Sequence, residues 1–123
     1  MSGKKQEDRV LARATYRYAG MSPRKIRLYA DLIRGKTADE ALQLLSFEIT
    51  RSARLMEKVL KSAVGNARFK EIDDVEDMIV NESRVDGGPI LKRSMPRARG
   101  SAYPIKKRTA HIHVGLATED ELA

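Results

Sequence analysis

The segment from residue 92 to residue 108, KRSMPRARGSAYPIKKR, is the feature that most constrains the fold, because it holds seven basic residues and no acidic one. No Asp or Glu occurs anywhere from Gly87 to Thr118. Like charges repel, and the segment offers few apolar side chains to a core, whereas a solvated surface normally mixes both signs of charge. We therefore expect this segment to lie outside the core and to meet a polyanion.

Two predicted strands flank the basic segment. MIVNESRV precedes it and TAHIHVGL follows it, and in the second the apolar residues alternate with His111 and His113. Because structureless loops beyond about 12–15 residues are uncommon, the strands are expected to continue pairing as a projecting β-hairpin arm over about residues 85–108. Arms of eight to ten residues reach roughly 25–33 Å. A two-stranded ribbon is marginal alone in water, so this arm is expected to be ordered only against an anionic wall.

The first part of the chain predicts a strand and then a helix. In LARATYRYAG, Ala12, Ala14, Tyr16 and Tyr18 are expected on one face of the strand. Ser22 is a candidate N-cap, Pro23 suits the first helical position and Gly35 supplies a stop. The first turns of this helix carry cations. Because the N-terminus is the positive end of the helix dipole, cations are unfavourable there unless an anion compensates. These cations are Arg24, Lys25 and Arg27.

Two further helices are predicted. Thr37 and Glu40 have the spacing of a capping box, in a short helix that buries Ala41, Leu42 and either Leu44 or Leu45. The longer helix is expected from about residue 47 to residue 69. Its apolar stripe is Ile49, Ala53, Met56, Leu60, Ala63, Val64 and Ala67, and its basic face is Arg51, Arg54, Lys58, Lys61 and Arg68. That basic face is either a solvated surface or a contact to a partner, and the sequence pattern does not distinguish between the two.

Length, charge and composition narrow the classes of function. At 123 residues the chain is expected to form one domain, and a net charge of +7 with a pI near 9.9 favours nucleic acid over an acidic membrane surface. The absence of Cys excludes disulfides and thiolate metal sites. No apolar run approaches the ~20 residues of a membrane span and the N-terminus lacks the apolar centre of a signal peptide, so we expect a soluble intracellular protein without membrane partners.

Catalytic and metal-binding readings are weak. His111 and His113 could ligate a metal, but no third ligand is in register, and exposed polar positions near phosphate explain them better. The acidic connection EIDDVEDM lacks the spacing of a calcium loop. No nucleophile with a base and no phosphate loop is found, so neither an enzyme nor a cofactor is expected. Two alternatives stay open. One is an architectural DNA binder that inserts a β-arm into the minor groove, and the other is an enzyme, which reproducible turnover of a substrate would reveal.

Four strings carry a family resemblance. They are SPRKIRLYADLIRGK, SAVGNA, VDGGP and KRSMPRARGSAYPIKKRTAHIHV, in this order. The chain resembles the large-subunit ribosomal protein twenty-two family, bacterial type, from about Ala12 to Leu116. The resemblance implies an α+β fold with three helices packed on a three-stranded antiparallel sheet and a long projecting β-hairpin. We expect a single domain over residues 10–117, between a disordered tail at 1–9 and a disordered acidic tail at 118–123, because chain termini are usually poorly ordered.

The resemblance further implies function. Members are structural constituents of the cytoplasmic large ribosomal subunit that bind its RNA, support its assembly and contact neighbouring ribosomal proteins. The arm tip lines the nascent-peptide exit tunnel near the macrolide site. The implied RNA contacts are Arg17, Arg24, Lys25, Arg27, Arg34, Lys36, Lys92, Arg93, Arg97, Arg99, Lys106, Lys107, Arg108 and His111. The implied tunnel residues are Met95, Pro96, Ala98, Gly100, Ser101 and Ala102. Ser101 and Gly20 depart from the family, because many members carry a basic residue at each position.

Overall fold

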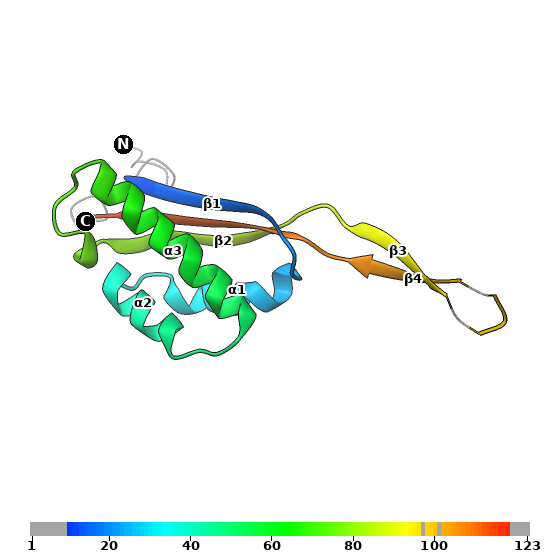
Figure 1. Ribbon diagram of the computed structural model, residues 1–123. Coiled ribbons are helices and arrows are strands. Elements are labelled where there is room, and N and C mark those ends of the chain that lie inside the picture. The colour runs from blue at the N-terminus through cyan, green and yellow to red at the C-terminus, as the bar shows by residue number, and fades with distance from the viewer. Residues whose placement is uncertain (1–9, 97, 101, 119–123) are drawn as a thin grey trace, which may run out of the picture.

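The computed structural model describes residues 10–96, 98–100 and 102–118. The tails expected at 1–9 and 119–123, and the predicted site residues Arg97 and Ser101, lie outside these ranges. Figure 1 shows a rounded body from which a thin ribbon projects. The described elements are β1 Ala12–Ala19, α1 Pro23–Ile33, α2 Ala38–Ser46, α3 Arg51–Phe69, β2 Ile79–Gly87, β3 Leu91–Pro96, β4 Ala102–Lys107 and β5 Ala110–Ala117, with 3₁₀ turns at Val75–Asp77 and Ala98–Gly100.

The body is a three-stranded antiparallel sheet with the helices on one face, which confirms the predicted α+β class (Figure 1). The strand order is β1-β5-β2, so β5 is central and pairs along both edges. Helix α3 packs over β1 and β5, and α1 packs beside β2. The alternating residues of β5 point into this layer, and Ile112, Val114 and Leu116 are fully buried against side chains such as Met56 and Leu60.

Two of the predicted helix signals act as expected. The Thr37 hydroxyl oxygen accepts a hydrogen bond from the Glu40 backbone N–H at 3.3 Å and so caps α2. Of the two leucines between which the sequence left the buried position open, Leu45 is fully buried and Leu44 only partly. Gly35 follows α1 with φ of 84°, the left-handed conformation that a glycine adopts without strain. Ser22 occupies the N-cap position of α1 with an extended backbone, but its side chain makes no capping hydrogen bond.

The predicted start of the long helix is wrong. Helix α3 begins at Arg51, because Thr50 is its N-cap and accepts a hydrogen bond from the Ala53 backbone N–H at 3.3 Å. The residues before Thr50 therefore form a connection, and the side chains of Phe47 and Ile49 are 83% and 96% exposed. Helical periodicity had placed Ile49 in the buried stripe. The rest of the predicted stripe is buried.

The predicted facing of Tyr18 is also wrong. The β1–β5 register shifts between Tyr16 and Ala19, and Tyr18 has a positive φ of 58°. Such a bulge moves the later residues of a strand to the opposite face. Ala19 consequently takes the buried position, and Tyr18 is 63% exposed.

The arm is a separate two-stranded ribbon that begins beyond Gly87. Residues up to Gly87 still pair with β5 in the body sheet. Among the described strands, β3 and β4 pair only with each other, from Leu91 opposite Lys107 to Pro96 opposite Ala102. At the base, the Gly88 N–H donates to the Thr109 carbonyl oxygen at 2.9 Å and the Thr109 hydroxyl donates to the Pro89 carbonyl oxygen at 2.7 Å. A Cβ on Gly88 would lie 2.5 Å from that hydroxyl oxygen, so only glycine fits this close approach.

Candidate phosphate-binding site at the base of the arm

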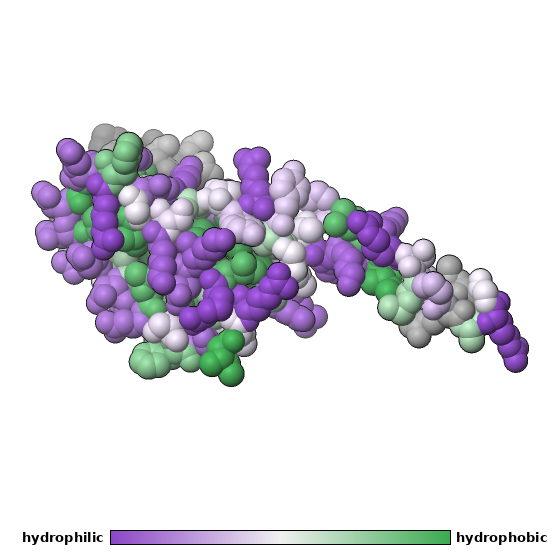
Figure 2. Space-filling model, in the orientation of Figure 1, coloured by the Kyte–Doolittle hydropathy of each residue, from purple (hydrophilic) through white to green (hydrophobic). Residues whose placement is uncertain are grey.

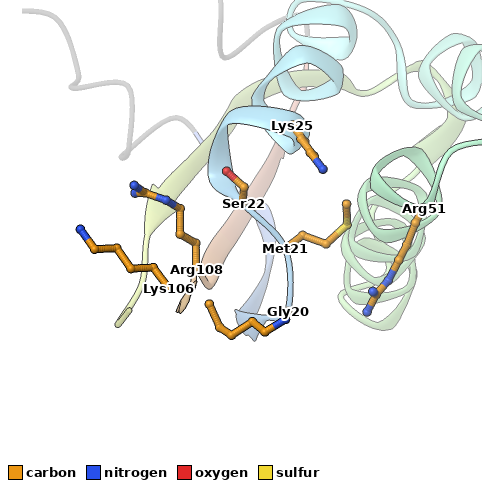
Figure 3. Close-up of a pocket in the computed structure, with 8 residues that line it drawn as sticks. Gly20, Met21, Ser22, Lys25, Arg51, Lys106 and Arg108 are labelled. Atoms are coloured by element: carbon orange, nitrogen blue, oxygen red, sulfur yellow. The ribbon is translucent and has the colours of Figure 1, made fainter. Parts of the chain in front are cut away.

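A basic cavity of about 330 Å³ lies where the arm joins the body (Figure 3). Three separate parts of the chain form it: the β1–α1 connection with the first turn of α1, the start of α3, and the end of the arm strand β4 with the residue after it. Its lining residues are Gly20, Met21, Ser22, Lys25, Arg51, Lys106, Lys107 and Arg108. Five of these are cations and none is a carboxylate. An anion with several oxygens, such as a phosphate group, matches this lining.

Helix electrostatics strengthen the preference of the basic cavity for an anion. Neither α1 nor α3 has an acidic residue in its first turn, although both helices begin at the cavity, with Lys25 in one first turn and Arg51 in the other. By contrast, the first turn of α2 carries Asp39 and Glu40, the usual complement to the positive end of a helix. Placing cations at a positive helix end costs about 0.3–1 kcal/mol each, and a bound anion reverses the sign of that contribution.

Local contacts hold the walls of the cavity. The Met21 N–H donates to the Ala19 carbonyl oxygen at 2.8 Å, which makes the tight turn between β1 and α1. The Ser52 hydroxyl lies 3.7 Å from the Met21 sulfur and joins this turn to α3. On the other side, the hydrogen bonds of Gly88 and Thr109 set the position from which Lys106, Lys107 and Arg108 reach the cavity.

The structure brings some predicted RNA contacts together and separates others. Lys25, Lys106, Lys107 and Arg108 line the basic cavity, whereas Arg17 and Arg24 are exposed elsewhere on the body. On the arm, Lys92, Arg93 and Arg99 are exposed, as are the predicted tunnel residues Met95, Pro96, Ala98 and Gly100. Ala102 begins β4. Arg99 has a positive φ of 63° within the tip turn.

Two other predicted contacts, Arg27 and Arg34, have internal partners for their side chains. The Arg27 guanidinium donates to the Val85 carbonyl oxygen at 3.0 Å, and Arg34 pairs with the Asp31 carboxylate at 2.9 Å and also donates to the Ser83 carbonyl oxygen. Lys36 is partly buried, and its backbone carbonyl accepts a hydrogen bond from the Val80 N–H. Part of the charge of Arg27 and Arg34 is thus used to fasten α1 to β2.

Arg51 is the cavity residue that the sequence left undecided. It was placed on the basic face of the long helix, without a choice between solvent and a partner. Most of that face has internal partners: Arg54 and Lys61 pair with Glu57 at 3.3 and 3.2 Å, Arg68 pairs with Glu76 at 3.6 Å, and the Lys58 ammonium lies 5.5 Å from the centre of the Tyr16 ring. The missing acid in the first turn of α3 was the available signal for Arg51.

The two histidines make structural contacts. His111 Nδ1 accepts a hydrogen bond from the Tyr18 backbone N–H at 3.0 Å, and the two rings meet edge to face at 4.9 Å. His113 Nδ1 lies 3.2 Å from the Thr15 hydroxyl, and its Nε2 lies 3.3 Å from the Asp86 carboxylate. Within the described ranges there is no group of three or more His, Cys, Asp or Glu side chains that could hold a metal ion.

His113 is expected to make stability depend on pH. Burial lowers its pKa below the ordinary value of 6.5, and the Arg84 guanidinium adds to this effect, while Asp86 and Glu82 oppose it. The unfolded chain therefore binds a proton more tightly than the folded one, so the free energy of unfolding falls as the pH drops below 6.5 toward the lowered pKa. Urea unfolding at about pH 7.5 and about pH 5.5 should show this loss, and His113→Asn should make it smaller. An unchanged pH dependence in the variant would contradict the assignment.

No helix in the described part of the chain is long and apolar enough to cross a lipid bilayer.

The fold and the basic cavity define a class of protein: a small basic α+β body with a charged β-arm, suited to a polyanion. The chain belongs to the family Ribosomal protein L22p/L17e, whose model matches residues 14–117.

Relatives of similar length support this membership. The chain is 50% identical over 108 residues to "Large ribosomal subunit protein uL22" of Rhodopirellula baltica, covering 84% of this chain and 91% of the relative. The protein of the same name from Caldicellulosiruptor saccharolyticus is 50% identical over 105 residues, covering 85% and 86%. That from Geobacter sulfurreducens is 49% identical over 106 residues, covering 86% and 96%.

Proposed function

We propose that this protein is a structural constituent of the large ribosomal subunit in the cytoplasm, where it binds the subunit's RNA and supports its assembly. The basic cavity holds RNA phosphate, and the arm threads into the RNA until its tip lines the nascent-peptide exit tunnel near the macrolide site. Its partners are the large-subunit RNA, neighbouring ribosomal proteins and the passing peptide. The role is architectural rather than catalytic.

The single observation that carries this proposal is the cluster of five cations, without a carboxylate, at the base of an acid-free arm. Each neutralised phosphate releases condensed counterions, which makes such a cluster favourable on RNA and unfavourable in water. The cavity also joins the arm to the first turns of α1 and α3, so RNA phosphate groups bound there fix the direction in which the arm leaves the body.

The arm itself supports an enclosed location. Every described side chain of β3 is exposed, and among the described strands none pairs with β3 and β4 as a third member. A wall of RNA phosphates supplies the missing neutralisation for the exposed Lys and Arg side chains. The tip turns tightly through Ala98–Gly100, where both Arg99 and Gly100 have positive φ, and its small residues suit a narrow passage.

The salt dependence of binding to large-subunit RNA tests the RNA contact, and thiol cross-linking tests the tunnel position. The chain has no Cys, so Met95→Cys introduces a single thiol one residue before the end of β3. In translating ribosomes a bifunctional maleimide, which adds to one thiol at each end, should cross-link this thiol to a stalled nascent peptide that carries its own thiol. Ser62→Cys, at an exposed position on α3, is the matched control and should give no cross-link. Equal yields from the two variants would contradict the tunnel position.

A further inference from the structure

The helical layer carries an apolar patch that neither the sheet nor the arm uses. Leu28 and Leu32 on α1 are 69% and 38% exposed, and Phe47 and Ile49 in the α2–α3 connection are more exposed still. We call these four residues the apolar patch. Figure 2 shows apolar atoms gathered at the lower edge of the body, over the α2–α3 connection. Single exposed apolar residues are ordinary, but a cluster of four large ones marks an interaction surface.

A shallow cavity of about 470 Å³ lies between α1 and the α2–α3 connection. It is lined by Leu28, Tyr29, Asp31, Leu32 and Glu48. Glu48 stands between Phe47 and Ile49 in the connection, so the cavity reaches the segment that carries these two exposed side chains. Its lining combines apolar side chains with two carboxylates, and such a combination of apolar and polar groups is common at protein-binding surfaces.

The connection that presents Phe47 and Ile49 is held in place by the body. The Arg54 guanidinium donates to the carbonyl oxygens of Leu45 and Glu48, on either side of Phe47. The Thr50 hydroxyl donates to the Tyr29 hydroxyl at 2.8 Å, which ties the end of the connection to α1. The fold thus holds the backbone that carries Phe47 and Ile49, so less conformational entropy is lost when a partner binds there.

The charge of the cavity indicates the partner. Asp31 and Glu48 are its charged lining residues, in contrast to the five cations of the basic cavity. Asp31 pairs with Arg34 at 2.9 Å, whereas Glu48 forms no salt bridge within the described part of the chain. A carboxylate beside an apolar floor repels RNA phosphate and attracts Lys or Arg.

We propose that the apolar patch docks a segment of a neighbouring large-subunit protein that combines apolar side chains with Lys or Arg. The apolar side chains cover Phe47 and Ile49, and a cation of the partner pairs with Glu48. This inference rests on the proposed place of the protein in the large subunit, but not on the RNA contacts or the tunnel position of the arm.

Photo-cross-linking in assembled large subunits tests the docking surface. With Phe47 replaced by p-benzoylphenylalanine, irradiation should produce a cross-link that survives ribonuclease, and mass spectrometry should map it to a segment containing both apolar and basic residues. The matched control places the same group at Phe69, which is equally exposed but lies at the opposite end of α3. This control should give at most about a tenth of the cross-linked protein, because Phe69 lies outside the patch.

Charge reversal separates docking from proximity. Glu48→Lys should lower the cross-link yield at position 47 about tenfold, whereas Glu48→Gln should lower it less. Because Glu48 lies at the surface of the cavity, unchanged urea midpoints should show that both variants fold. The inference would be overturned if Glu48→Lys left the cross-link yield unchanged or if no cross-link formed at all. It would also be overturned if the cross-link joined position 47 to RNA, to a second copy of the protein or to the chain's own tail. Absence of the unaltered protein from purified large subunits would instead overturn the proposed function.

Discussion

Replacing Lys106, Lys107 and Arg108 together by Gln should lower the affinity for purified large-subunit RNA by roughly one to two orders of magnitude at moderate salt. All three side chains line the basic cavity, where they are positioned to contact phosphate. Each lost phosphate contact removes about 0.7–0.9 from the slope of log affinity against log salt, so the slope should become shallower by about two to three. A filter-binding titration across salt concentrations measures both quantities.

The control for this prediction removes the same charge from another surface. Lys58, Lys61 and Arg68 on α3 each have an internal partner, so changing these three to Gln should alter the slope by less than about one. Both triple variants should retain the urea midpoint of the unaltered protein, because the substituted side chains are largely exposed. If the two variants changed the slope equally, the affinity for RNA would depend on the net charge of the protein rather than on the basic cavity.

Ile112→Ala should lower the free energy of unfolding by about 2–5 kcal/mol. Ile112 is fully buried in the central strand, opposite Tyr16 of β1 on one side and Val85 of β2 on the other. Truncation removes apolar burial and leaves a cavity that the sheet and helices cannot fill without moving. Urea unfolding should show a lower midpoint with an unchanged slope, which separates lost stability from a change in the unfolded state.

Two isoleucine controls locate this effect in the body. Ile112→Val should cost only about 0.5–1.5 kcal/mol, because most of the side chain remains. Ile105→Ala on the arm strand β4 should cost less than about 1 kcal/mol, because Ile105 is only partly buried on a two-stranded ribbon. Destabilisation by Ile105→Ala as large as that by Ile112→Ala would show that the arm folds as part of the cooperative core.

Local patterns were enough to predict most of the elements. Alternation in the last strand identified the buried side of β5, and the cap residues Thr37 and Gly35 marked helix ends at the right places. These signals work because strand and helix periods, turn conformations and caps depend on neighbours within a few residues. The errors fell where a second local signal competed, as when Thr50 capped α3 and left Ile49 outside it.

The candidate site was predictable only in part. The acid-free run pointed to the arm residues, and Lys25 with Lys106, Lys107 and Arg108 do line the basic cavity. Arg51 was not singled out on the basic face of its helix, although the first turn of α3 lacks an acid. The partners of its neighbours on that face, such as Glu57 and Glu76, become visible only in the structure. The apolar patch was hidden for a related reason: Phe47 and Ile49 look like core residues in a helical pattern.

What the order of residues decided for this protein is its class of fold, its sign of charge and the existence of an arm, since periodicity and charge runs act over short stretches of chain. What packing alone decided is which charges stay free to meet a partner. Arg27 and Arg34 are drawn into hydrogen bonds with β2, while Lys25, Arg51 and Arg108 converge from distant parts of the chain on one cavity. Such convergence depends on long-range contacts between α1, α3 and the arm, and no local pattern specifies those contacts.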